Sequence, residues 1–148
     1  METWRKDLVN EAKTWLQTPW HHEGRVKGAG ADCGQLLIAC YVNTGLVPQF
    51  DTGHYPRDWM FHRSEERFLG WVTQYLDEVG QPLPGDVVAW KHARCFSHGA
   101  IVVEWPVVIH AHVRSRQVCY ANADQGELSH AKRGGARPKK FFSIAGRL

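Results

Sequence analysis

The chain has 148 residues, 43% hydrophobic and 22% charged, which suffices for one globular domain with a single core, so we assign residues 1–148 to one domain. The formal net charge is only +3 at pH 7, which argues against a dedicated nucleic-acid-binding protein. No apolar run approaches the length of a membrane span, which argues against insertion into a membrane.

The first residues, 1–7, lack the apolar centre of a signal peptide. We therefore expect a protein made in the cytoplasm without a leader, which something else must carry to any site outside. From Trp4 to Leu16, apolar residues recur every three to four positions. This spacing predicts an amphipathic helix over about 4–17, which ends at Thr18-Pro19.

A polar, glycine-bearing loop over 20–31 leads to a second helical pattern, from about 32 to 44. Its apolar positions predict a strongly buried helix, and Gly45 suits its C-terminal end. Residues 47–57 are predicted to form a long loop, because proline and glycine interrupt a polar stretch. A third amphipathic helix is expected over roughly 64–79, begun by Ser64 and the acidic residues after it.

The second half of the chain has a different pattern of residues from the first. Short β-branched and aromatic runs alternate with turn residues, which predicts antiparallel strands. These runs cover 87–90, 99–103, 107–109, 117–120 and, at the end, 140–144. Helices followed by a meander of strands predict an α+β domain in which N-terminal helices pack on a C-terminal antiparallel sheet of about five strands.

Cys33 follows a glycine-rich approach and stands at the start of the second helix. The unsatisfied N–H groups and the positive end of the helix dipole at that position lower the pKa of a thiol, so we expect a reactive thiolate. Gly28, Gly30 and Gly34 leave the backbone bare for an extended substrate. The alternative is an inert, buried cysteine. The other cysteines form no C-x-x-C pair, which indicates reduced thiols.

Two histidines in the predicted sheet can serve such a nucleophile. A cysteine nucleophile needs a base, and the base needs a group that fixes its tautomer. His98, at the start of one predicted strand, and His110, on the next strand, suit these two roles. A two-residue turn at Trp105-Pro106 would put them on opposite faces, whereas an odd-length turn or a bulge restores one face and leaves them staggered. His112 is the alternative to His110.

Five motifs in order, spanning about residues 5–125, resemble the NlpC/P60 family of papain-like cysteine peptidases, which cut peptide stems of bacterial peptidoglycan. The motifs are Pro19-Trp20, Gly28 to Cys33, Pro84-Gly85-Asp86, His98 to Val102 and Ile109-His110-Ala111. The resemblance implies the papain-like NlpC/P60 fold, no cofactor, and hydrolysis of the bond between D-γ-glutamyl and a diamino acid. We predict that residues in or beside these motifs contact the substrate, namely Trp20, Asp32, Gly34 and Ser97.

Three features depart from the family pattern. Trp20 replaces a tyrosine, so a phenol hydroxyl near the cysteine is expected to be lost, and Gly34 replaces a serine after the cysteine. The segment between Gly45 and Leu83 is longer than the family minimum. Longer forms resemble the branch carried on the tails of bacteriophages and phage-like particles. This implies tail tip or hub proteins as partners, and action in the periplasm or cell wall of a bacterium.

Two other hypotheses stay open at this point. The chain can be a structural adaptor of a tail tip that keeps the fold without needing the chemistry. It can also hold a metal, because the spacing of Cys95 and His98, and of His110 and His112, suits metal ligands. No H-E-x-x-H motif of a metallopeptidase occurs in the sequence, so we predict no metal.

Overall fold

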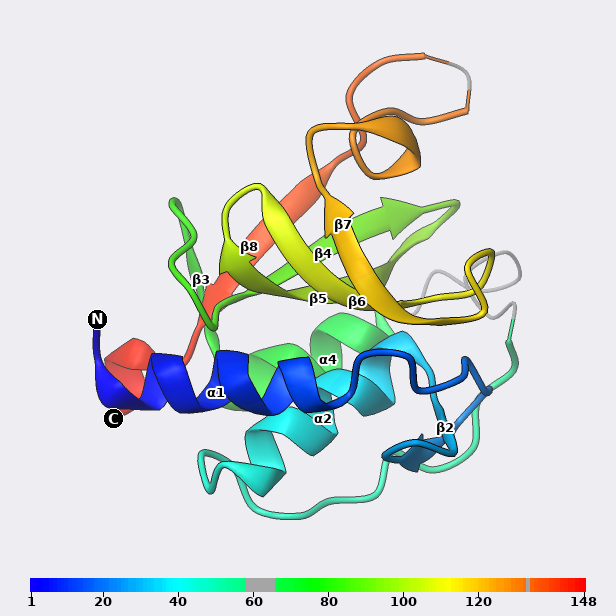
Figure 1. Cartoon of the computed structure of the whole chain (residues 1–148). Coiled ribbons are helices and arrows are strands. Elements are labelled where there is room, and N and C mark those ends of the chain that lie inside the picture. The colour runs from blue at the N-terminus through cyan, green and yellow to red at the C-terminus, as the bar shows by residue number, and fades with distance from the viewer. Residues whose placement is uncertain (58–65, 133) are drawn as a thin grey trace.

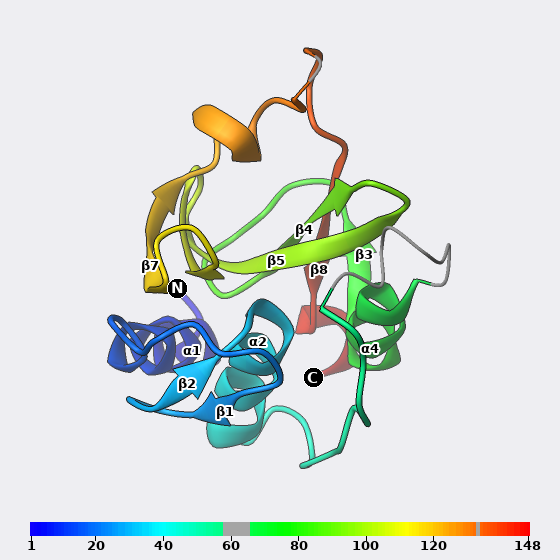
Figure 2. The same ribbon diagram turned by 90° about the vertical axis from the view of Figure 1, so that its right-hand side faces the viewer.

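The computed structural model of the chain describes residues 1–57, 66–132 and 134–148. In these ranges, three α-helices pack beneath a curved antiparallel sheet (Figure 1). The helices are α1 (Thr3–Thr14), α2 (Cys33–Asn43) and α4 (Arg67–Tyr75). Seen after a quarter turn, α2 lies between α1 and α4 under the sheet (Figure 2). The predicted α+β class is confirmed.

The sheet has six strands in the order β3-β8-β4-β5-β6-β7. Five of them are the predicted strands, of which the first four are longer than predicted and the last is shifted by one residue: β4 (Val87–His92), β5 (Cys95–Glu104), β6 (Val107–His112), β7 (Gln117–Asn122) and β8 (Lys139–Ser143). The C-terminal strand returns beside β4, and not beside its predecessor in the chain. This return leaves one edge of β8 free to pair with another segment.

The sixth strand, β3 (Asp77–Val79), corrects the expectation of a helix up to residue 79. The helix α4 ends at Tyr75, where Leu76 turns to extended backbone. Asp77 to Val79 then pair with the free edge of β8. Pairing with a distant strand outweighs the local helical pattern here, which is a tertiary effect that periodicity does not reveal. The expected start of this helix, residues 64 and 65, lies outside the described residues.

The loop expected over 20–31 contains a small hairpin. Its strands, β1 (Arg25–Val26) and β2 (Gly30–Ala31), pair antiparallel and lie beside α1 and α2 (Figure 2). Ala31 is fully buried, and the backbone of Trp20 forms a further bridge to it. The hairpin thereby holds the chain firmly just before α2 begins.

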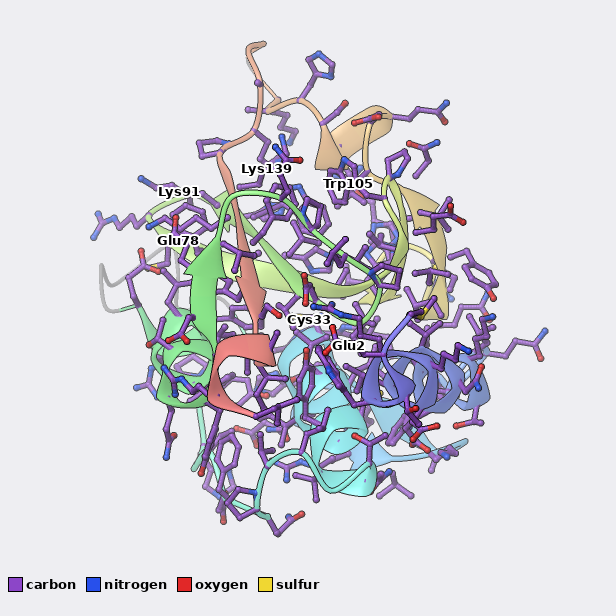
Figure 3. The ribbon with its side chains drawn as sticks, turned by 90° about the vertical axis from the view of Figure 1, so that its left-hand side faces the viewer. Glu2, Cys33, Glu78, Lys91, Trp105 and Lys139 are labelled. Carbon is purple, nitrogen blue, oxygen red and sulfur yellow. The ribbon has the colours of Figure 1, made fainter. Side chains whose placement is uncertain are left out.

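Each face of the sheet carries its own core. The larger core lies between the sheet and the helices and includes Leu36, Ile101 and Ile109. The second core lies on the other face, where Trp90 and Val102 pack under the short 3-10 helix η1 (Gly126–Leu128). In Figure 3, the labelled Trp105 lies beside η1, above the sheet. The sheet is therefore buried on both sides near its middle.

Gly99 shows how closely the helices approach the sheet. A Cβ atom at this position would lie 2.3 Å from Cζ of Phe68 on α4 and 3.0 Å from Cδ1 of Leu37 on α2. We expect Gly99→Ala to lower the free energy of unfolding by about 1–3 kcal/mol, because the core must shift to admit the methyl group. Urea denaturation followed by circular dichroism measures this change.

The matched control for this prediction is Gly70→Ala in α4. A Cβ at Gly70 would meet nothing within 4 Å, so the helix gains up to about 1 kcal/mol from the better propensity of alanine. Opposite signs for the two variants are the expected result. Equal stabilities of Gly99→Ala and the wild type would contradict the close packing of α2 and α4 on β5.

The Pro84-Gly85-Asp86 turn that opens β4 is anchored to the helices. Arg5 of α1 donates from Nη1 to Asp86 Oδ1 at 2.8 Å and to the carbonyl of Pro84 at 2.9 Å, and both charged groups are buried. The hydroxyl of Tyr41 on α2 donates to the carbonyl of Gly85 at 2.6 Å. The end of β4 that is farther from His92 is thus held against α1 and α2.

Candidate active site

Cys33 is the first residue of α2, as the sequence predicts, and Asp32 caps the helix. Oδ1 of Asp32 accepts a hydrogen bond from the backbone N–H of Gln35 at 2.9 Å, which satisfies one of the free donors of the first turn. Figure 3 shows Cys33 where α2 meets the underside of the sheet. The thiol donates a weak hydrogen bond to the carbonyl of Ser97 on β5, at 3.5 Å.

The other carboxylate oxygen of Asp32 joins two distant segments. Oδ2 accepts from the backbone N–H of Glu23 at 2.9 Å and from the hydroxyl of Tyr55 at 2.5 Å. Tyr55 is 8% exposed and its hydroxyl also accepts from Nε2 of Gln35. The expectation that no phenol lies near the cysteine is therefore wrong. The segment after Gly45 supplies one, from a position that the motifs do not cover.

A bulge in the β5–β6 hairpin brings His98 and His110 together. Ile101 pairs with Ile109, but the register shifts by one residue near the turn. Extending the pairing places His98 and His110 on one face of the sheet, two residues apart along the strands. The two rings lie edge to face, and Nε2 of His98 is 2.8 Å from Nδ1 of His110. The bulge thus puts the two histidines on the same face and leaves them staggered, as one of the sequence-based alternatives predicts.

His112 is engaged elsewhere. Its Nδ1 bonds the hydroxyl of Ser115 at 2.8 Å, and its Nε2 bonds a carboxylate oxygen of Glu127. Its ring stacks on that of His110 with the centroids 4.8 Å apart. Hence His110 contacts His98, while His112 packs behind it and faces η1. The catalytic roles of these histidines stay a prediction, but the geometry favours His110 over His112.

A groove of about 800 Å³ runs over this site. Cys33 and His98 both line it, whereas His110 does not. All four residues predicted to contact substrate line it too: Trp20, Asp32, Gly34 and Ser97. Several other residues that line the groove were not predicted from the sequence, among them Tyr55, Arg57, Trp71, His92, Arg114 and Glu127. They come from loops, from α4, from η1 and, for His92, from the end of β4, and no motif covers these positions.

The lack of a side chain at Gly34 is explained by its contact with Trp71 of α4. A Cβ at residue 34 would lie 2.8 Å from Cζ3 of the indole ring. The ring therefore occupies the space that a serine side chain would need in the family pattern. Trp71 also packs tilted on Tyr55, with the ring centroids 5.2 Å apart. Together the two rings form an aromatic wall of the groove beside Cys33.

The pKa of the Cys33 thiol corrects the sequence-based expectation of a lowered value. Burial, and then the negative charge of Asp32, raise this pKa to about 12. Hydrogen bonds from the backbone N–H groups of Gly99, Gly34 and Cys33 itself lower it by less. The cap that satisfies the helix start also places a carboxylate beside the sulfur. The resting site therefore holds a protonated thiol.

The two paired histidines are neutral as well. Burial, and then the neighbouring His110, hold the pKa of His98 well below its usual range. Burial and His112 lower the pKa of His110 to about 4. A neutral His98 that donates from Nε2 to His110 carries its lone pair on Nδ1. His98 is thus in the form that can accept the thiol proton.

The lowered pKa of His110 makes the stability of the fold depend on pH. The unfolded chain binds this proton near pH 6.5 and the folded chain only near pH 4. Its contribution is therefore complete above about pH 6.5 and is lost as the pH falls toward 4. Between pH 7 and pH 5 we expect His110 alone to cost about 2 kcal/mol of unfolding free energy.

Urea denaturation at both pH values, on the wild type and on His110→Asn, measures this contribution. The variant is expected to lose less stability between pH 7 and pH 5, because it lacks the titrating group. The control is His130→Asn, which makes the same substitution at an exposed histidine. An unchanged dependence in His110→Asn would show that this ring is not held neutral by burial.

The structure offers no support for a metal centre or a membrane span in its described part. No group of three or more His, Cys, Asp or Glu residues within residues 1–57, 66–132 and 134–148 is arranged to hold a metal ion. None of the helices in those ranges is both long and apolar enough to cross a membrane. Cys95, proposed as a ligand in the metal hypothesis, is fully buried in the core under the sheet.

Comparison with known proteins identifies the fold. No family model matches the sequence, and a comparison with curated proteins gives no match. Among solved structures, the NlpC/p60 domain of the peptidoglycan hydrolase SagA has a TM-score of 0.61 at 19% identity, over 92% of this chain and 96% of that chain. NlpC1 from Trichomonas vaginalis gives 0.63 at 15% identity, over 96% of this chain and 47% of that chain.

A third similar structure is the peptidoglycan hydrolase RipB from Mycobacterium tuberculosis, with a TM-score of 0.61 at 12% identity, over 95% of this chain and 64% of that chain. The chain therefore spans a whole NlpC/P60 domain but only about half to two thirds of the longer proteins. These similarities show that the chain has the NlpC/P60 fold, as the five motifs predicted. At such identities the likeness concerns the fold.

Proposed function

We propose that the chain is a cysteine peptidase that hydrolyses amide bonds in the peptide stems of bacterial peptidoglycan. The observation that carries this proposal is one constellation: a helix-start thiol and a neutral histidine line the same groove, and a second buried histidine fixes the first. Similar folds occur in proteins described as peptidoglycan hydrolases. Fold and site together favour hydrolysis over a purely structural role.

The reaction follows from the protonation states. The S–H of Cys33 turns from the Ser97 carbonyl to Nδ1 of His98, which takes the proton as the sulfur attacks the amide carbon. His110 accepts the Nε2–H of His98 and stabilises the cation that forms. The backbone N–H of Cys33, at the helix start, stabilises the oxyanion. His98 then returns its proton to the leaving amine, and water releases the acyl group from the sulfur.

The bond that we propose joins D-γ-glutamate to the diamino acid of the stem. This part of the proposal is supported by the motif resemblance alone. The test is digestion of purified peptidoglycan, with mass spectrometry of the released fragments. Wild-type fragments that end at D-glutamate, absent with Cys33→Ala, are the expected result. Fragments cut elsewhere would overturn the bond, and no fragments from the folded wild type would favour the adaptor hypothesis.

We further propose that a phage or phage-like tail carries the chain to the cell wall, with tail tip or hub proteins as its partners. The support is the long segment between Gly45 and Leu83, which resembles that branch of the family. Mass spectrometry of purified particles from a producing strain tests this proposal. Its expected result is peptides of this chain in the tail fraction. Their absence from particles, with the chain abundant in the cell, would contradict the carriage.

A further inference from the structure

His92, at the end of β4, lies beside the candidate active site and has no role in the mechanism above. Its ring meets that of His98 edge to face, with the centroids 5.9 Å apart, and it lines the groove. The ring of His98 also stacks on that of Trp90. His92 therefore lines the groove from the sheet, whereas Cys33 lines it from the start of α2.

The protonation state of His92 follows from its neighbour Arg137. Nη1 of Arg137 lies 3.2 Å from Nδ1 of His92, and a guanidinium can only donate. Nδ1 therefore accepts, and the proton of the neutral ring is on Nε2. Burial, and then the charge of Arg137, lower the pKa of His92 to about 4. The ring stays a neutral Nε2–H donor at any pH near 7.

Arg137 is itself held in place. Its Nε donates to the carbonyl of Glu127 at 2.7 Å, and its Nη1 also donates to the carbonyl of Lys91 at 2.9 Å. These bonds tie the segment after η1 to the end of β4. The orientation of the His92 ring is therefore fixed from behind, before any substrate arrives.

The Nε2–H of His92 is buried and has no hydrogen-bond partner among the described residues. An unpaired buried donor is costly, and folded proteins rarely keep one without a reason. Here the donor belongs to a ring that lines the groove. An acceptor that enters the groove with the substrate would satisfy it.

We propose that His92 is a substrate-binding residue, whose Nε2–H donates a hydrogen bond to an oxygen atom of the peptide in the groove. The proposal rests on the proposed function. A fixed neutral donor suits the amide and carboxylate oxygens that recur along a peptide stem. Its position beside His98 places the bound oxygen next to the bond that is cut.

Two variants separate this role from support of Arg137. In His92→Asn the side-chain oxygen can replace Nδ1 as the acceptor for Arg137, but no group reaches the position of Nε2. In His92→Gln the amide nitrogen reaches that position and restores a donor. Kinetics on a synthetic stem peptide that carries the D-γ-glutamyl bond to a diamino acid give kcat and KM for both. His130→Asn is the matched control, since His130 is exposed and does not line the groove.

We expect His92→Asn to lower kcat/KM about tenfold or more, chiefly by raising KM, because it removes a bond made in the bound state. His92→Gln is expected to retain a larger share of kcat/KM. A wild-type kcat/KM in His92→Asn, or a greater loss in His92→Gln, would overturn the inference and leave the proposed function intact. A folded wild type that cleaves no stem peptide would overturn both.

A binding experiment provides a readout without turnover. In the Cys33→Ala protein, nitrogen-15 spectra of the histidine rings report which nitrogen of His92 carries the proton. Addition of the same stem peptide is expected to shift the Nε2–H resonance of His92 and to leave that of His130 in place. Saturation with the peptide without a shift at His92 would contradict the proposed contact.

Discussion

Replacement of Cys33 by alanine is expected to abolish hydrolysis of peptidoglycan, with a loss of about 10⁴-fold or more in rate. The sulfur lines the same groove as His98 and bonds the carbonyl of Ser97, the residue before that histidine. The fold should survive the change, since alanine is a good helix former and the Asp32 cap does not involve the thiol. Release of soluble fragments from a peptidoglycan suspension measures the loss.

Cys119→Ala is the matched control, because Cys119 lies on β7, outside the groove. It is expected to cleave at the wild-type rate. Alkylation with iodoacetamide adds a second readout: with its pKa raised to about 12, Cys33 should react slowly at pH 7 and faster as the pH rises above 9. Appreciable cleavage by Cys33→Ala would mean that another group attacks the amide.

Replacement of His110 by alanine is expected to lower kcat by about 10²–10⁴-fold. The loss arises because Nε2 of His98 then has no partner to fix its tautomer or to stabilise its cation. His110→Asn should recover part of the rate, since its oxygen lies near the position of Nδ1 and can accept from His98. Steady-state kinetics on a soluble stem peptide separate kcat from KM.

The comparison variant is His112→Ala. His112 bonds Ser115 and Glu127 but not His98, so its loss should change kcat far less than the loss of His110. The reverse order, with His112→Ala the more damaging, would assign the third position to His112 and would contradict the hydrogen-bond geometry described above.

The elements that the sequence predicts well are those whose pattern matches their environment. The helix at Cys33 is apolar on nearly every side and is buried accordingly. The strands β4 to β7 are separated from one another by segments with clear turn residues. By contrast, β3 exists only because β8 returns to the sheet beside β4 and leaves an edge to pair. A pairing between residues 77 and 143 leaves no trace in the local pattern of either segment.

The candidate site likewise combines residues that the sequence predicts with features that depend on the tertiary fold. Cys33, His98 and His110 were predicted from chemistry and spacing, and the bulge that aligns the histidines was one of the alternatives that the spacing left open. The raised pKa of Cys33 was not predicted, because the helix dipole acts locally whereas burial and the Asp32 charge depend on packing. Tyr55 and His92 were missed because the tertiary fold, and not sequence spacing, brings a loop residue and the last residue of β4 to the groove.

The first and the last residues of β4 lie at opposite sides of the molecule, which we call its back and its front. The first residues of β4 follow the turn that Arg5 of α1 anchors, whereas its last residue, His92, borders the groove. The chain also finishes at the back, since β8 runs from its pairing with Trp90 toward Val87 and then ends. Both termini accordingly lie at one side of the molecule (Figure 1). A tether or carrier joined at either terminus would hold the domain by its back and leave the groove turned outward, open to a polymer.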